Sequence, residues 1–363
     1  MPRRTDNSVD FWRGLALIVI FINHVPGIVY ERFTQRNYGL SDSAELFVFL
    51  AGWSLRGLAA NRDDPLTMQR MILRVGGRAV VIYGAQIVIT MLAIGLLAGV
   101  ALGMDNPLLL EWHNASAVFH DPVRAHIGLV LLTHQLGYFN ILPLYVALMV
   151  GAVGLAICHR LAPRLVLPLS VALYLWAISM PFNFRMWPVD DGWFFNPLCW
   201  QLIFVLGFLL AADEGPGAFV RRHAGLLRLS GLVVVLLGLG ATQLHYAPDP
   251  LSVPQPVLLF VFDKTYLSPA RLLHALGLYA LLAGSFPLFS PYIPRLTAYF
   301  CLLGRNGLYV FCVGSIASLA GQIARFVFGG SLAVDTVILG LGLVVLGLTA
   351  WLCELRDRLR AAA

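Results

Sequence analysis

The chain has 363 residues, of which 59% are hydrophobic and 12% are charged. Soluble domains carry about 25% charged residues, so this composition excludes an ordinary soluble enzyme and indicates an integral membrane protein. The formal net charge of +6 does not indicate a nucleic-acid-binding protein, because no basic run alternates with aromatic residues as such a surface requires.

Apolar segments predict an all-α fold, namely a polytopic membrane protein with about ten transmembrane helices. The expected spans, in chain order, are 11–30, 43–60, one within 79–104, 136–158, 165–184, 195–212, 229–246, 269–289, 306–325 and 332–353. The segment 127–133 is expected to be a short re-entrant or interfacial piece of a long loop. No soluble domain fits between the spans, so residues 1–363 are predicted to form a single membrane-embedded domain.

The basic residues support this topology. With the amino terminus in the cytoplasm, 18 of the 25 Lys and Arg residues fall on the cytoplasmic side. This bias agrees with the positive-inside rule and predicts that both termini are cytoplasmic. The seven on the opposite side are Arg32, Arg36, Arg124, Arg185, Lys264, Arg271 and Arg325.

The five cysteines lie in or at the ends of apolar segments and show no C-x-x-C spacing. We therefore interpret them as small buried apolar residues rather than a disulfide or metal framework, and no metal site is predicted. The first apolar segment has no cleavage site of the A-x-A type before Glu31, so it is expected to be a retained helix rather than a signal peptide.

A histidine inside the first apolar segment is the strongest functional signal. Arg13 precedes His24 by eleven positions, roughly 16 Å along a helix. This places Arg13 at the cytoplasmic edge and His24 in the outer half of the bilayer. An interhelical hydrogen bond would explain His24 alone. However, an ionisable group inside a membrane is a functional candidate by default, and Asn23 beside it can orient the ring.

Glu45 lies near the outer end of the second span, with six apolar residues after it. We expect it to find a partner at the depth of His24. Asp42, by contrast, is interpreted as the amino-terminal cap of this helix, because Asp is a preferred capping residue.

Further polar residues are expected at the outer face. Arg271 and His274 are three apart and share a helix face. Lys264 is the only lysine, and snorkelling to the interface would explain it alone. Trp and Tyr nearby belong to the interfacial belt, whereas buried amides need partners. The candidate substrate-binding residues are therefore Asn140, Asn196, Gln201, Lys264, Arg271 and His274.

Arginines gather at the inner face. The positive-inside rule explains most of them. Arg13 and Arg305 lie at helix edges rather than in mid-loop, which suits phosphate binding, and Asp10 and Asn306 beside them are assigned to the same site. A long anionic donor such as an acyl thioester of coenzyme A, with phosphates at one end and a reactive carbonyl at the other, would use both faces.

These residues resemble a known family. The spacing Arg13-x10-His24 is similar to the Arg-x10-His motif of the membrane-bound acyltransferase-3 superfamily. Over about residues 5–355 an ordered set of segments resembles its OpgC-type branch: Asn7-Ser-Val-Asp10-Phe-Trp-Arg13-Gly14, Ser41-Asp-Ser-Ala-Glu45-Leu-Phe-Val-Phe-Leu, Tyr138-Phe-Asn140-Ile-Leu-Pro-Leu-Tyr145, Phe195-Asn196-Pro-Leu-Cys-Trp200-Gln201 and Leu303-Gly-Arg305-Asn306.

The resemblance implies a ten-helix enzyme of the bacterial inner membrane. Such an enzyme takes an acyl group, succinyl in the named case, from a cytoplasmic acyl-CoA and places it on a periplasmic glucan. It also implies that His24 is the essential membrane histidine. Succinyl-CoA or acetyl-CoA would be the donor, and the partners would be the bilayer and a glucan or other envelope glycan.

The leading hypothesis is therefore a transmembrane O-acyltransferase. His24 would act as general base on a sugar hydroxyl or carry the acyl group, and Glu45 would orient or pair with it. The alternative is a proton-coupled secondary transporter that uses His24 and Glu45 as a relay, although no inverted repeat is evident. A non-enzymatic scaffold would leave His24 unexplained. The acyl group, the acceptor and the oligomeric state are open at this point.

Overall fold

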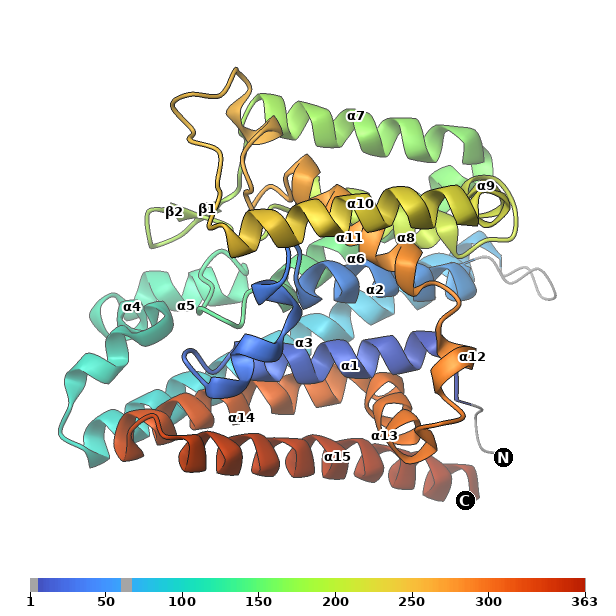
Figure 1. The fold of residues 1–363 in the computed structure, drawn as a ribbon. Helices are drawn as coiled ribbons and strands as arrows, with labels where there is room; N and C mark the ends of the chain where they lie inside the picture. Colours follow the sequence, from blue (N-terminus) through green and yellow to red (C-terminus); the bar gives the residue numbers. More distant parts are fainter. Residues whose placement is uncertain (1–5, 60–66, 363) are drawn as a thin grey trace. The chain divides into compact units, whose positions relative to one another are not determined.

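The structure is a computed structural model that describes residues 6–59 and 67–362 (Figure 1). These residues are mostly helical and contain one pair of two-residue strands, which confirms the predicted all-α fold. The chain divides into two compact units. Unit 1 holds the chain up to Phe47, Arg228–Leu244 and the chain from Ala275, and unit 2 holds Val48–Leu227 and His245–His274. The predicted cytoplasmic residues Arg3, Arg4 and Arg62, and the expected end of the second span at Ala60, lie outside the described residues.

Five helices of the described chain are long and apolar enough to cross a membrane, which indicates a multi-pass membrane protein. They are α3 (Met68–Gly103), α6 (Ile141–Leu161), α10 (Ala224–Gln243), α14 (Gly307–Phe328) and α15 (Leu332–Ala362). The other expected spans contain shorter helices, so ten crossings are not confirmed. These are α1 (Ser8–Asn23), α2 (Ser43–Ala59), α7 (Val166–Ser179), α8 (Pro197–Leu210) and α11 (Pro269–Leu282).

The boundaries of α1 and α3 differ from expectation for local reasons. α1 ends at Asn23 rather than near residue 30, because Pro26 and Gly27, whose φ is 76°, stop the helix. Two 3-10 helices, η1 (Val29–Phe33) and η2 (Gln35–Asn37), follow. α3 begins at Met68, earlier than expected, because the Thr67 hydroxyl caps it.

The connecting segments are more ordered than the sequence predicted. The long loop before α6 contains η3 (Pro107–Asn114), α4 (Ser116–His120) and α5 (Pro122–Val130), so the re-entrant segment expected at 127–133 is the end of α5. Two-residue strands, β1 (Arg185–Met186) and β2 (Asp191–Gly192), form an antiparallel hairpin that the all-helical expectation missed. The remaining short helices are η4 (Pro163–Leu165), α9 (Pro216–Arg222), η5 (Val257–Leu259), α12 (Phe286–Phe289) and α13 (Pro294–Arg305).

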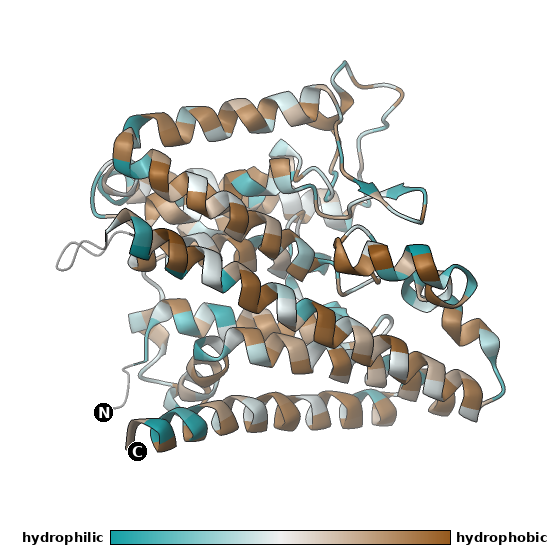
Figure 2. Cartoon of the chain, turned by 180° about the vertical axis from the view of Figure 1, so that it is seen from behind, coloured by the Kyte–Doolittle hydropathy of each residue, from teal (hydrophilic) through white to brown (hydrophobic). Residues whose placement is uncertain are grey.

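Glycines bring the helices of unit 1 into close contact. A Cβ at Gly14 would overlap the Phe300 carbonyl oxygen, and a Cβ at Gly304 would overlap the Asp10 carbonyl oxygen, so α1 and α13 touch backbone to backbone. α14 and α15 lie side by side (Figure 1). Figure 2 shows the hydrophilic residues of α15 gathered at its carboxyl end, as a helix that leaves a membrane requires.

An ion pair with a buried carboxylate joins the carboxyl end of α14 to the start of α15 in unit 1. Arg325 donates to Asp335 at 2.7 Å, and the Val29 amide donates to the other carboxylate oxygen at 2.7 Å. Asp335 is only 1% exposed. The carboxylate therefore fixes η1 to the start of α15.

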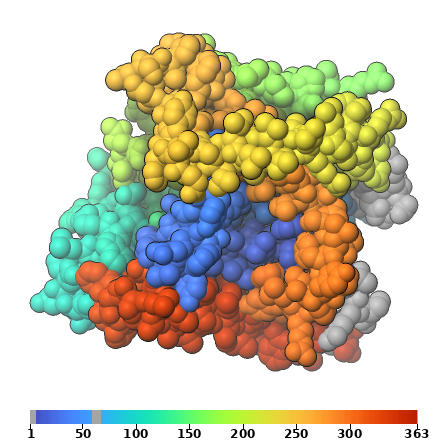
Figure 3. All heavy atoms as spheres, in the orientation of Figure 1, coloured from blue at the N-terminus to red at the C-terminus, as the bar shows by residue number. Residues whose placement is uncertain are grey.

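Unit 2 is also built on close helix contacts. A Cβ at Gly52 would overlap the Phe204 carbonyl oxygen, and a Cβ at Gly207 would overlap that of Phe49, so α2 and α8 interlock. α3 packs on α6, and α7 packs on α8. Helix α10, most of which belongs to unit 1, carries apolar side chains on its exposed surface, which suits contact with lipid (Figure 3).

Candidate functional site

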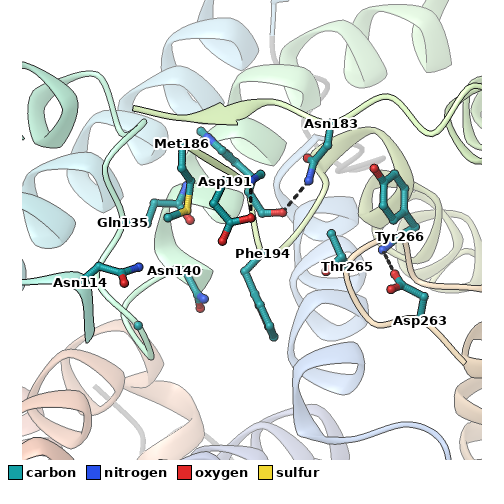
Figure 4. A pocket seen from close by; sticks show the side chains of 13 residues that line it. Asn114, Gln135, Asn140, Asn183, Met186, Asp191, Phe194, Asp263, Thr265 and Tyr266 are labelled. Carbon is teal, nitrogen blue, oxygen red and sulfur yellow. Dashed lines mark hydrogen bonds between the residues drawn. The ribbon is translucent and has the colours of Figure 1, made fainter. Parts of the chain in front are cut away.

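A polar cavity of about 510 Å³ lies within unit 2 (Figure 4). Its lining comes from four loop regions that precede or connect the apolar helices. These contribute amides, carboxylates and aromatic rings: Asn114, Gln135, Gly137, Asn140, Asn183, Met186, Asp191, Gly192, Trp193, Phe194, Asp263, Thr265 and Tyr266. Such a mixture of ring faces and hydrogen-bonding groups is typical of a site for a polar organic ligand.

Local backbone geometry positions these side chains. Asn114 ends η3 in a left-handed conformation with φ 63°, which Asn tolerates better than most residues. The β1–β2 hairpin presents Asp191, and the Asn183 amide donates to the Trp193 carbonyl at 2.9 Å. Asn140 lies at the start of α6 without a capping hydrogen bond from its side chain. In Figure 4 Asn114, Gln135 and Asn140 lie on one side of the pocket, and Asn183, Thr265 and Tyr266 lie on the other.

Two carboxylates give the cavity a negative character. One oxygen of Asp191 accepts from the Gly192 amide at 2.7 Å, and one oxygen of Asp263 accepts from the Tyr266 amide at 2.7 Å. Burial, together with the nearby Cys199 and Asp263, raises the pKa of the Tyr266 phenol. Its hydroxyl donates to the Pro181 carbonyl at 2.9 Å, so this ring is held as a neutral wall.

His134 is a buried histidine next to the cavity lining in the chain, and the sequence does not predict it as a site residue. It is 2% exposed and precedes the lining residue Gln135. Burial lowers the pKa of its imidazole, and a backbone hydrogen bond with Asn114 partly opposes that change. The ring is therefore neutral near pH 7.

Two of the predicted substrate-binding amides have structural partners. Asn196 is fully buried and caps α8, since its side chain accepts from Leu198 N at 3.0 Å and donates to the Phe182 carbonyl at 2.6 Å. Gln201 forms a reciprocal pair with Ser170, at 2.7 Å to its hydroxyl and 2.8 Å to its carbonyl. These bonds join α7, α8 and the preceding loop, and contact of either amide with a substrate stays a prediction.

Of the six predicted substrate-binding residues, all within the described chain, only Asn140 lines the cavity. Lys264 lies over the rings of Phe194 and Phe195, with Nζ 5.6 Å from each ring centroid. Arg271 and His274 occupy successive turns of α11, and His274 is 2% exposed. Contact of these three residues with a substrate stays a prediction.

The predicted donor-binding residues meet in unit 1, where α1 begins and α13 meets α14. Arg13 donates to the Gly304 carbonyl at 3.3 Å and lies 3.5 Å from the Asp10 carboxylate. Asn306 ends α13 and donates to the Leu302 carbonyl at 3.0 Å.

Arg305 lies in this same part of unit 1, where α13 meets α14, between two carboxylates. It contacts Asp6 and Glu354, each at 3.0 Å. Arg305 therefore joins the start of the described chain to the carboxyl-terminal part of α15, and the cytoplasmic placement of both termini stays a prediction. These ion pairs stabilise the contact between the start of the described chain, α13 and α15. Phosphate binding by Arg13 and Arg305 stays a prediction.

His24 occupies the carboxyl-terminal cap of α1 rather than the helix interior. Its carbonyl accepts from the Gln322 side chain at 2.6 Å. The capping role expected for Asp42 is confirmed, because its carboxylate accepts from the Ala44 amide at 2.8 Å. The fully buried Glu45 accepts from the Asp42 amide at 2.9 Å, which completes a capping box.

Comparison with protein families gives one match. The family model described as OpgC protein matches residues 4–358. The chain belongs to the OpgC protein family. Membership, with the apolar helices, indicates a multi-pass membrane transferase that modifies glucans. Neither the curated proteins nor the solved structures contain a match.

The sequence does not predict most lining residues of the cavity. Two expected substrate-binding residues, Asn196 and Lys264, lie close in the chain to the lining residues Phe194 and Asp263 but do not line the cavity themselves. A usable signal existed in the amides and aromatic residues that precede α6 and α8. No group of three or more His, Cys, Asp or Glu that could hold a metal ion occurs in the described part of the chain.

Proposed function

We propose that this OpgC family member is a transmembrane O-acyltransferase of the bacterial inner membrane. It would take an acyl group, such as succinyl, from cytoplasmic acyl-CoA and transfer it to a hydroxyl of a periplasmic glucan or related envelope glycan. The observation that carries the proposal is the family match over residues 4–358. The apolar helices, which indicate a multi-pass membrane protein, support it.

Helix α1 offers a route between the two faces. Arg13 in its first turns and His24 at its end are separated by roughly 16 Å. A donor held by its phosphates near Arg13 and Arg305 could therefore present its thioester near His24 through its long pantetheine arm. The acyl group would cross the bilayer while coenzyme A stays on the cytoplasmic side.

Two roles remain open for His24. As general base, it accepts the proton of the sugar hydroxyl while that oxygen attacks the thioester carbonyl. The carbon–sulfur bond then breaks, and the proton passes to the coenzyme A sulfur. As acyl carrier, one ring nitrogen attacks the thioester carbonyl and displaces the coenzyme A thiolate, which takes the proton of the other ring nitrogen. The sugar oxygen then attacks the acyl group, the ring leaves, and the hydroxyl proton returns to the ring. Both roles need a neutral imidazole, and Glu45 would orient it.

The test is a transfer assay with purified full-length protein in nanodiscs. Succinyl-CoA or acetyl-CoA is supplied with a glucose oligomer, and thiol release and the mass of the oligomer are measured. We expect His24→Ala to lower the rate by about 10²-fold or more. His126→Ala is the matched control, because His126 is an exposed residue of α5. Transfer by folded His24→Ala at the wild-type rate would contradict the assignment.

A further inference from the structure

Three arginines lie on one exposed face of α3, a helix of unit 2. Arg70, Arg74 and Arg78 are spaced four residues apart, which places them on successive turns of the same face, and all three are exposed. The other face of this part of α3 packs into its unit, since Met71 and Val75 are buried. The arginine row therefore lies on the side of the helix that faces away from the core of its unit.

The described chain supplies no carboxylate for this row. Helix α3 contains no Asp or Glu. The two carboxylates between α8 and α9 pair with other arginines, Asp213 with Arg221 at 3.2 Å and Glu214 with Arg56 at 3.4 Å. Over residues 6–59 and 67–362, the guanidinium groups of the row form no ion pair.

Such a row is electrostatically unfavourable by itself. Like charges four residues apart on a helix repel each other, and cations near the amino terminus oppose the helix dipole. Arg70 lies in the first turn of α3 and Arg74 in the second. An anion bound along this face would relieve both costs, so charge complementarity indicates an anionic partner.

The length of α3 gives the depth of the row in a membrane. The stretch from Ala79 to Gly103 contains no charged residue and is about 38 Å long, enough to cross a hydrocarbon core of about 30 Å. Arg78 therefore lies at the boundary of that core, and Arg74 lies about 6 Å beyond Arg78. Because the headgroup layer is roughly 5–8 Å thick on each side, these two side chains are level with lipid phosphates. Arg70 lies at the outer edge of the layer, within reach through its long side chain.

The backbone between Arg74 and Arg78 is uncovered. Gly76 and Gly77 lie there, and a Cβ at either position would meet nothing within 4 Å. Val81, on the next turn of the same face, is 57% exposed. Open space beside two guanidinium groups, with an apolar surface directly below, suits a phosphate headgroup whose acyl chains run along the helix.

We propose that the exposed face of α3 from Arg70 to Arg78 binds an anionic phospholipid of the leaflet at this end of the helix. Arg74 and Arg78 donate charge-assisted hydrogen bonds to the phosphate oxygens, and Arg70 attracts the headgroup from the edge of the layer. The positive-inside rule explains the side of the membrane on which arginines lie, but not their alignment on one face without carboxylates. The inference is independent of the proposed acyl transfer.

The test is a competition between two lipids for the purified full-length protein. The protein in neutral detergent is mixed with equal amounts of phosphatidylglycerol and phosphatidylcholine that carry the same acyl chains, and native mass spectrometry counts each lipid retained. We expect the wild-type protein to retain mainly the anionic lipid. Arg74→Gln should lower the ratio of anionic to neutral lipid about fivefold, and Arg74→Gln combined with Arg78→Gln about 25-fold.

Arg358→Gln is the matched control. Arg358 is also an exposed helical arginine, with 59% of its side chain exposed, but it donates to Glu354 at 3.2 Å. Its replacement removes the same charge and should leave the lipid ratio unchanged. Thermal unfolding identifies any variant that fails to fold, and Arg78→Gln alone then takes its place.

Three results would overturn the proposal. The first is equal retention of the two lipids by the wild-type protein. The second is a fall in Arg358→Gln as large as that in Arg74→Gln, because net charge rather than the α3 face would then attract the lipid. The third concerns coenzyme A, whose phosphates share the chemistry of a lipid phosphate. If calorimetry in nanodiscs of neutral lipid shows that the double variant loses coenzyme A binding, the α3 face is a donor site instead. Coenzyme A binding that persists in the double variant, together with loss of the anionic lipid, supports the lipid surface.

Discussion

The ion pair between Arg325 and Asp335 gives the sharpest prediction for the stability of this protein. Asp335 is 1% exposed, whereas the Arg325 side chain is 17% exposed and keeps some contact with solvent. At an effective dielectric constant of about 20, two charges 2.7 Å apart attract by roughly 6 kcal/mol. Desolvation of both ions cancels most of that gain in the intact pair.

Asp335→Asn removes the charge but keeps an oxygen for the Val29 amide. The Arg325 charge then lacks its partner in a poorly solvated position. Breaking a fully buried pair costs about 3–5 kcal/mol, and the partial exposure of Arg325 reduces this to about 2–4 kcal/mol. We expect the free energy of unfolding to fall by that amount.

The assay is denaturant unfolding in detergent micelles, followed by tryptophan fluorescence and circular dichroism. The double variant Arg325→Met with Asp335→Asn should lose less than Asp335→Asn alone, because no charge is left without a partner and the Val29 amide keeps its acceptor. Asp357→Asn is the control, because its 61% exposed carboxylate should change stability by less than about 0.5 kcal/mol. An unchanged stability of Asp335→Asn would refute the reasoning.

Three further predictions concern other parts of the fold. Gly304→Ala should lower the free energy of unfolding by about 2 kcal/mol or more, because its Cβ would overlap the Asp10 carbonyl and push α13 from α1. Asn196→Ala should cost about 1–3 kcal/mol through loss of the α8 cap and of its bond to the Phe182 carbonyl, both read by the same unfolding assay. The lowered pKa of His134 means that, as pH falls below 6.5, the unfolded chain takes up a proton that the folded chain does not. Stability should therefore decline with acidification, and His134→Gln should flatten that decline in unfolding curves measured from pH 7.5 to 5.

Each of these predictions has its own control. Gly340→Ala, in open space on α15, should leave stability unchanged or raise it slightly. Asn196→Asp keeps the cap and should cost less than Asn196→Ala. A pH profile that is the same with and without His134 would show that this ring is not the source of the pH dependence.

The membrane helices could be predicted because the signal is local. A segment that crosses a bilayer must satisfy its own backbone and present apolar side chains, so composition over about 20 residues reveals it. For the same reason the sequence predicts the cap at Asp42, which acts on its immediate neighbours. Pro26 and Gly27 likewise explain the end of α1 from local sequence alone.

The amides show where local reasoning ends. The sequence indicates that Asn196 and Gln201 need partners, but not which ones. In the tertiary structure Asn196 donates a hydrogen bond to the Phe182 carbonyl, and Gln201 accepts one from the Ser170 hydroxyl. These partners lie on other elements, so the residues that flank each amide in the sequence do not reveal them. The sequence therefore could not show whether the partner of each amide is a substrate or a neighbouring segment of the protein.

The cavity is the feature that only the tertiary structure decided. Its walls come from segments near Asn114, Gln135, Asn183 and Asp263, which are far apart in the chain. Each segment alone resembles an ordinary polar loop. The sequence by itself determined an all-α membrane protein and its family, because apolar length and ordered motifs are linear properties. The close approach of these loops depends on how the helices pack, which is a property of the folded chain.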